Sequence, residues 1–167
     1  SEQGQPYASY AVAQMYSKGE YVAENKETAQ RYYKAALSGF LELESKDQAD
    51  DNLYYKLGAM YKNCLGTEID IPKAIEYFEK STENMWSTYQ LGRLYLFGAE
   101  GVEKDKEKAA QWLTKSANDG NEYAQNMLDD MGHFENMLLR NTVMGLFVNL
   151  SRCIEDDYTQ KYKSVRR

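Results

Sequence analysis

Residues 91–120 have the sequence LGRLYLFGAEGVEKDKEKAAQWLTKSANDG, and this stretch decides the fold. It contains two short helical patterns, and Gly98 and Gly101 lie in the turn between them. Neither pattern can bury its apolar side by itself, so a unit of this kind is stable only when neighbouring copies cover it. We therefore looked for the same unit elsewhere in the chain.

Both halves of the unit recur earlier in the sequence. The first half follows the pattern apolar, small, any residue, apolar, Tyr, and it is found at residues 12–16, 57–61 and 91–95. The second half follows each time, at residues 29–36, 74–81 and 110–117. A fourth first half begins at Gly120, but Asp129 replaces its small residue, so this copy is degraded. The chain therefore contains about three and a half copies.

The spacing within each copy is helical. Ala8, Val12 and Tyr16 fall on one helix face because they recur every four residues. The small residue of the first half predicts two helices that cross closely there and leave no room for a side chain. The positions concerned are Ala13, Gly58 and Gly92.

Caps and breakers mark where these helices begin and end. Asn25, Asp70 and Asp105 are predicted N-caps of the second helices, and Pro72 suits a first turn. Glycines at positions 39 and 120 are predicted to end their helices as C′ residues. The first copy has an excess at residues 41–51, LELESKDQADD, which either extends a helix or forms an acidic loop.

The alternation LGxxY…G…GV…D…A…WxxKSAxxG resembles the Sel1-like repeat, a relative of the tetratricopeptide repeat. The resemblance covers about residues 4–131 and is clearest in the third copy, whereas Cys64 replaces the turn glycine of the second. The third copy matches at Gly98, Gly101, Val102, Asp105, Ala109, Trp112 and Ala117. The resemblance implies an all-α fold, a right-handed α-α superhelix of antiparallel helix pairs with a concave face. We assign this solenoid to residues 1–131.

In the tetratricopeptide relatives the first helix of each pair lines the groove, at positions three and six residues before the small residue and one after it. The resemblance places there Tyr7, Tyr10, Gln14, Asn52, Tyr55, Trp86, Tyr89, Arg93, Tyr123 and Asn126. Most of the positions before the small residue are Tyr or Trp, which are enriched at interface hot spots. The alternative is that these rings pack between repeats. Arg93 near the centre suggests a partner with apolar or aromatic side chains and an acidic group.

Residues 132–157 form a second, apolar helical pattern. Since the open end of a solenoid exposes apolar surface, we expect this segment to be a capping helix. The alternative is an exposed amphipathic helix for a partner or a membrane surface. Residues 158–167 are a basic tail that we expect to continue in a longer parent protein. The tail is solvated or contacts phosphates through Lys161, Lys163, Arg166 and Arg167.

The stretch at residues 146–161, LFVNLSRCIEDDYTQK, resembles the C-terminal region of mobilisation relaxases from conjugative elements of Gram-positive bacteria. Such proteins can place Sel1-like repeats after a catalytic nuclease domain. The nuclease part would need histidine metal ligands and a catalytic tyrosine, and the sequence has no such cluster. The resemblance implies a module within a transfer protein.

Little in the sequence suggests catalysis. The single histidine, His133, is expected at the surface, and no catalytic, cofactor-binding or metal-binding motif is present. Cys64 and Cys153 are expected to be reduced thiols of a cytoplasmic protein. No run of 18 apolar residues is present, so we expect no membrane span.

We therefore expect a non-catalytic scaffold without cofactor or metal that binds a protein or peptide partner on its aromatic-lined concave face. The alternative is an accessory domain that contacts nucleic acid through the basic tail, although the net charge of −6 argues against general nucleic-acid binding. Salt separates the two, because a phosphate-driven contact weakens steeply as salt rises.

Overall fold

A computed structural model describes residues 4–165, with side-chain surroundings given for residues 5–147. The described residues form seven helices and, apart from an isolated bridge between Ala99 and Val102, no β-structure. The all-α prediction is confirmed. The helices are α1 (Gly4–Lys18), α2 (Lys26–Ser45), α3 (Asp51–Lys62), α4 (Ile71–Lys80), α5 (Met85–Phe97), α6 (Lys106–Asn118) and α7 (Glu122–Val165).

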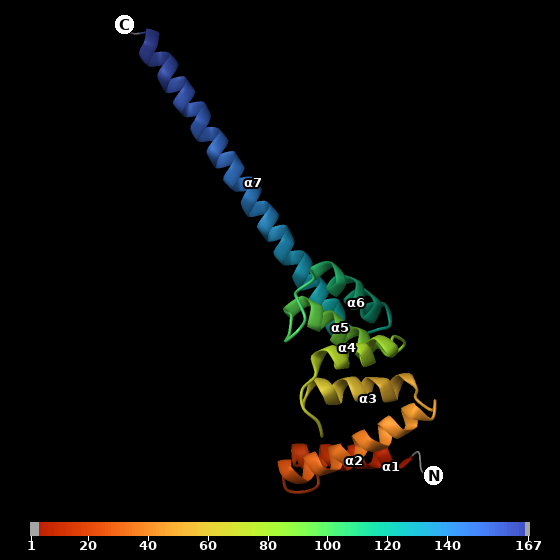
Figure 1. Ribbon diagram of the computed structural model, residues 1–167. Helices are drawn as coiled ribbons and strands as arrows, with labels where there is room; N and C mark the ends of the chain where they lie inside the picture. Colours follow the sequence, from red (N-terminus) through yellow and green to blue (C-terminus); the bar gives the residue numbers. More distant parts are fainter. Residues whose placement is uncertain (1–3, 166–167) are drawn as a thin grey trace. The chain divides into compact units, whose positions relative to one another are not determined.

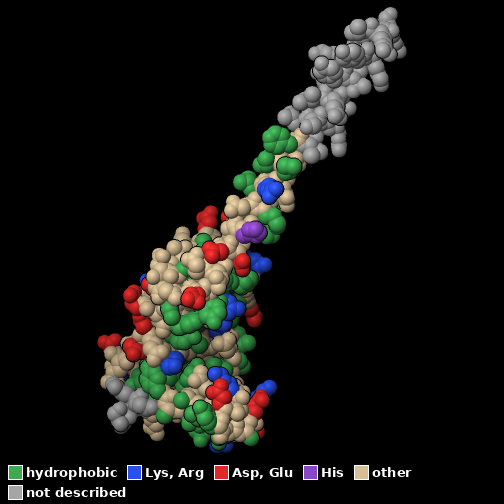
Figure 2. Space-filling view, turned by 180° about the vertical axis from the view of Figure 1, so that it is seen from behind, with side chains coloured by type: hydrophobic (Ala, Val, Ile, Leu, Met, Phe, Trp, Pro, Cys, Tyr) green, Lys and Arg blue, Asp and Glu red, His purple; other side chains and the backbone are tan. Residues whose placement is uncertain are grey.

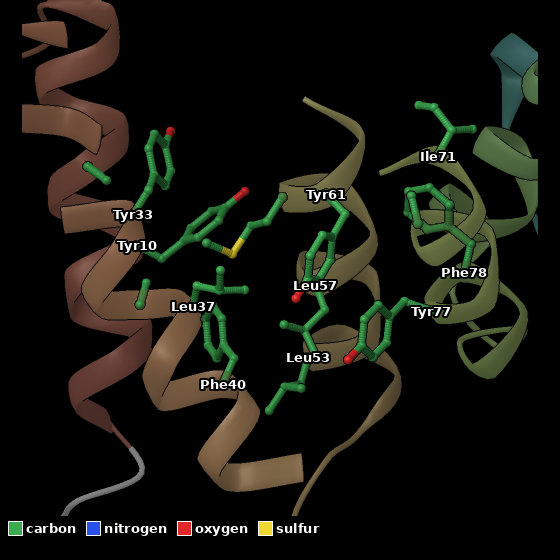
Figure 3. Packing of buried hydrophobic residues seen from close by; sticks show 14 of the residues in the cluster. Tyr10, Tyr33, Leu37, Phe40, Leu53, Leu57, Tyr61, Ile71, Tyr77 and Phe78 are labelled. Atoms are coloured by element: carbon green, nitrogen blue, oxygen red, sulfur yellow. The ribbon is translucent and has the colours of Figure 1, made fainter. Parts of the chain in front are cut away.

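The chain divides into two compact units, Ser1–Gln125 and Asn126–Arg167, which are described separately. In the first unit α1 pairs with α2, α3 with α4 and α5 with α6, and the three pairs follow one another as layers of a solenoid (Figure 1). Side chains from neighbouring pairs interdigitate in the core (Figure 3). The largest side chains that are fully buried there are Phe40, Phe78, Leu53, Leu57, Met60, Leu91 and Leu113.

The three predicted N-caps of the second helices are confirmed. The Oδ1 atoms of Asn25, Asp70 and Asp105 each accept a hydrogen bond of 2.9 Å from the backbone N–H three residues later. The backbone N–H of each cap also donates to the carbonyl of the repeat tyrosine that ends the first half, at 2.8 to 3.0 Å. The same short connection therefore closes every repeat.

The small positions lie where the two helices of a pair approach each other. A Cβ atom on Gly58 would lie 2.6 Å from the ring of Phe78, and one on Gly92 would lie 2.6 Å from Cγ of Leu113. Ala13, the equivalent residue of the first pair, is fully buried. The predicted close crossing is confirmed at these positions.

One predicted helix end is wrong. Gly39 does not stop α2, which continues to Ser45, so the excess at residues 41–51 mainly extends a helix. Gly39 is instead a contact position, because a Cβ atom there would lie 2.5 Å from Cγ of Pro6 in α1. Gly120 follows α6 with a φ of +94°, as expected for a residue that ends a helix.

The second unit contains most of α7, whose first four residues belong to the first unit, and the helix runs unbroken through the expected boundary between residues 131 and 132. Its described side chains beyond His133 are exposed, and many are large and apolar (Figure 2). They are Phe134, Met137, Leu138, Leu139, Val143, Met144, Leu146 and Phe147. The lid function of residues 132–157 stays a prediction.

Among the described residues, no helix combines the length and the hydrophobicity that crossing a membrane requires.

Candidate functional site: an aromatic face on the first helices

The predicted groove residues lie on the first helix of each pair. Tyr7 and Tyr10 belong to α1, Tyr55 to α3, and Trp86 and Tyr89 to α5. Residues three apart share one side of a helix, so each pair of rings projects in the same direction. We call the six residues Tyr7, Tyr10, Tyr55, Trp86, Tyr89 and Tyr123 the aromatic face.

Three rings of the aromatic face form a cluster that is open to solvent. The centroid of Trp86 lies 6.2 Å from that of Tyr89 and 6.0 Å from that of Tyr123, and the two tyrosine centroids are 6.3 Å apart. These distances are typical of edge-to-face or tilted aromatic contacts. Trp86 remains 37% exposed and Tyr123 62% exposed. The rings therefore fix one another in place and still present apolar surface.

The rings on α1 are buried more deeply. Tyr10 is 8% exposed and packs edge-on against Tyr33 of α2, with 5.5 Å between the centroids. Burial raises the pKa of Tyr10 to about 12. Tyr7 is half-buried and contacts Phe40 at 5.0 Å. Tyr10 thus contributes mainly to the core, whereas part of Tyr7 remains accessible.

Tyr55 of α3 lies near the α1 end of the aromatic face. It is half-buried, contacts the ring of Phe78 with a centroid distance of 6.2 Å, and has a pKa raised by burial. Tyr55 lies close enough to Tyr10 to contribute electrostatically to the raised pKa of Tyr10. The rings of α1 and α3 are therefore neighbours on this face.

Two lysines of α3 that the sequence analysis did not single out, Lys56 and Lys62, are half-buried. Nζ of Lys56 lies 4.5 Å from the ring centroid of Tyr10, within the range of a cation–π contact. Burial lowers the pKa of Lys56, and the carboxylate of Asp50 partly opposes this effect. Burial also lowers the pKa of Lys62, and the charge of nearby Arg93 adds to it. The signal in the sequence was only that Lys56 directly follows Tyr55.

The polar residues that were predicted to line the groove differ in how exposed they are. Arg93 is exposed and its guanidinium lies 5.7 Å from the ring centroid of Tyr89. Asn52 is exposed and Gln14 is half-buried. Asn126 is exposed but belongs to the second unit. The side chains of Lys161, Lys163, Arg166 and Arg167 lie outside the described residues.

The described residues contain no group of three or more His, Cys, Asp or Glu side chains that could hold a metal ion. Cys64 is an exposed free thiol. The aromatic face offers rings and hydrogen-bonding hydroxyls, and Lys56, Lys62 and Arg93 add three cationic groups beside it. Such a surface can hold an apolar or aromatic side chain beside a carboxylate.

Comparison with known proteins agrees with the repeat pattern. The family model described as Sel1 repeat matches residues 6–39, 53–84 and 87–121. The chain is 34% identical over 107 residues to the Sel1-repeat-containing protein YjcO of Escherichia coli K12. That match covers 60% of this chain and 46% of the relative, so the chain spans about half the length of the curated relatives it matches.

Two solved structures are similar at 28% identity and a TM-score of 0.50. One is a Sel1 repeat protein from Oxalobacter formigenes, for which the match covers 76% of this chain and 90% of that one. The other is c5321, a protective antigen of uropathogenic Escherichia coli strains, for which the match covers 78% of this chain and 34% of that one. The resemblance of residues 146–161 to mobilisation relaxases is not shown by these comparisons.

Proposed function

The chain belongs to the Sel1 repeat family, and from that membership we propose that it is a non-catalytic scaffold module that binds a peptide segment of a partner on its aromatic face. Sel1 repeat proteins are generally scaffolds for protein–protein interaction. The proposal adds to this general role a surface on this chain and a chemistry for the bound segment.

The open cluster of Trp86, Tyr89 and Tyr123 is the observation that carries the proposal. Rings that served only to pack one repeat on the next would be buried as completely as Leu91 or Leu113. Trp86 and Tyr123 are instead exposed while their neighbours hold them in place. Large, rigid and partly polar side chains in such a setting give up little entropy when a partner covers them, which is why they dominate binding hot spots.

The cationic groups favour an acidic segment. Lys56 and Lys62 are half-buried and have lowered pKa values because burial disfavours their charged form. A carboxylate from a partner would compensate this cost with a charge-assisted hydrogen bond. Exposed Arg93 lies near Lys62, and its guanidinium can donate hydrogen bonds to the same carboxylate or to a second one. The segment that fits is therefore short, acidic and aromatic or apolar.

Selection from a random-peptide display library tests this proposal. Immobilised full-length chain should enrich peptides that combine Asp or Glu with aromatic or large apolar residues. Lys56→Glu with Arg93→Glu should shift the selection away from acidic peptides, whereas Lys26→Glu, a reversal at an exposed lysine at the start of α2, should leave it unchanged. Enrichment that ignores the first pair of reversals would contradict the proposed chemistry, and no enrichment at all would contradict the peptide site.

The parent protein, the contact with nucleic acid and the cellular location remain predictions. Location within a conjugative mobilisation protein depends on the resemblance of residues 146–161 alone. Nucleic-acid contact through the basic tail depends on four side chains that lie outside the described residues. A cytoplasmic location depends on the expectation that both cysteines are reduced. Binding that weakens steeply with salt would favour the nucleic-acid alternative.

A further inference from the structure

The exposed rings of the first helices are concentrated on α5. Every ring on α1 and α3 is buried or half-buried. On α5, in contrast, Trp86 is 37% exposed and Phe97 is 56% exposed. Phe97 is not part of the aromatic face, and the sequence analysis did not single it out. The aromatic surface that a partner can reach therefore extends along α5 rather than across the three first helices.

Four side chains form a row along one side of α5, which we call the α5 row. They are Trp86, Tyr89, Arg93 and Phe97. Successive members are three, four and four residues apart, and this spacing places them on the same side of a helix. Because an α-helix rises 1.5 Å per residue, the row is about 16 Å long. The row is therefore three turns of helix in length.

The positive charge lies in the middle of the α5 row. Exposed Arg93 separates two apolar ends, the ring cluster around Trp86 on one side and Phe97 on the other. Lys62 of α3 lies beside Arg93, whose charge adds to the effect of burial in lowering the pKa of Lys62. Within the described part of the chain, neither cation forms an ion pair. This part of the surface thus favours an acidic group from a partner.

The spacing of the α5 row is the one through which helices pack on each other. Side chains three and four residues apart form the ridges that fit between the side chains of a second helix. A partner strand would instead need a free strand edge for its backbone hydrogen bonds, and the backbone groups within α5 are paired inside the helix. An extended peptide that crosses the first helices would need exposed rings on α1 and α3, where the rings are at most half-exposed.

We propose that the segment bound by this protein is an amphipathic helix that lies along α5 and contacts the whole α5 row. Its middle turn carries an acidic residue opposite Arg93 and Lys62, and its two outer turns carry large apolar residues opposite Trp86 and Phe97. This inference rests on the proposed function and deepens it, because it gives the conformation of the segment and the order of its residues. It also adds Phe97 to the binding surface.

Selection from two display libraries on the immobilised full-length chain tests the proposal. One library presents a stable helix of about three turns that is randomised along one side, and the other is the unstructured random library described above. The helix library should enrich sequences with Asp or Glu in the middle turn and large apolar residues in both outer turns. A proline in the middle turn should weaken binding of these sequences roughly tenfold or more, because it breaks the helix.

Variants of the α5 row then locate the bound helix. Phe97→Ala should weaken binding of the enriched helices roughly tenfold, as the loss of a contact ring does at an interface. Arg93→Gln should weaken binding only of helices that carry the acidic residue. Ile69→Ala is the matched control, because this side chain is 57% exposed between α3 and α4 and lies outside the row, so it should change nothing. Circular dichroism verifies that each variant is folded, and Phe97→Gln replaces Phe97→Ala if that variant is not.

The possible failures are distinguishable. Enrichment from the unstructured library alone would overturn the helix and leave the peptide site standing. Enriched helices that lack an acidic middle turn, or that bind Phe97→Ala as tightly as the wild type, would also overturn the proposal, since they would not follow the α5 row. Enrichment from neither library would contradict the peptide site itself together with the helix.

Discussion

Gly58 and Gly92 show how a single atom sets the distance between two helices. At Gly92 an added Cβ would meet Cγ and Cδ2 of Leu113 at 2.6 and 2.7 Å, and the backbone nitrogen of Leu113 lies 3.3 Å away. The backbone cannot move aside without separating α5 from α6. The sequence predicted this requirement because the small residue recurs at the same place in each copy.

Gly92→Ala is therefore expected to destabilise the fold, although alanine usually stabilises a helix. Overpacking of a helix crossing costs about 1–3 kcal/mol in the free energy of unfolding. Gly132→Ala is the matched control, because nothing lies within 4 Å of an added Cβ there, and it should be neutral or stabilise α7 slightly. Urea denaturation measures both. Equal stability of Gly92→Ala and the wild type would show that the register of the repeats is wrong.

Tyr10 gives a prediction that depends on pH. Its pKa rises from 10.0 to about 12 on folding because the ring is buried. The folded state thus keeps a proton that the unfolded state loses, so this contribution to stability is complete below pH 10 and is lost as the pH rises toward 12. Tyr10→Phe should make the fall in unfolding free energy above pH 10 shallower. An unchanged slope would show that Tyr10 is not buried in solution.

The lysines of the aromatic face could not be predicted from the sequence. Lys56 and Lys62 look like ordinary exposed residues of a helix, but both are half-buried, and the ring of Tyr10 from another helix lies 4.5 Å from Nζ of Lys56. The burial of Tyr10 was also not predicted from the sequence. Its position in the row suggested a groove, but its contact with Tyr33 places it mostly in the core.

At the scale of the helices, helix ends were predicted correctly where the residue at that position has only one common structural role. Asn25, Asp70 and Asp105 start helices as expected because a side-chain acceptor at that point satisfies a free N–H group. The prediction at Gly39 was wrong because glycine can either end a helix or allow another element to approach closely, and here it does the second. The sequence shows the glycine, but it cannot show that Pro6 approaches it and that α2 continues.

The length of α7 leads to a prediction about a fragment ending at residue 131. If residues 132–157 cap the repeats, this fragment should melt at a lower temperature than the full chain or aggregate, because the apolar surface at the open end of the repeats would be exposed. Thermal unfolding followed by circular dichroism measures both. A fragment that is equally stable and monomeric would contradict the lid.

At the scale of the whole molecule, the repeat pattern accounts for the stacked pairs of the first unit. Each contact between neighbours uses the same few positions, so a pattern of about one hundred residues was enough to predict the solenoid. The repetition also explains why the sequence could not predict which positions are buried. Equivalent positions such as Met15 and Met60 have identical residues but different surroundings, and only the structure shows which of them is covered.

The central claim is that the aromatic face binds a partner rather than packing the repeats. The most direct test measures two properties of Trp86→Ala with Tyr89→Ala, the melting temperature and the affinity for a peptide selected on the wild type. Truncation of central hot-spot rings should cost about 2 kcal/mol of binding or more, roughly a thirtyfold loss of affinity. Tyr21→Ala, at an almost fully exposed ring outside the aromatic face, is the matched control for binding.

Leu113→Ala is the comparison for stability, since loss of a fully buried leucine costs about 2–5 kcal/mol. Our account predicts that the double variant melts close to the wild type and binds the peptide at least thirtyfold more weakly, while Tyr21→Ala changes neither property. A double variant that melts as low as Leu113→Ala and, where folded, binds the peptide like the wild type would contradict it.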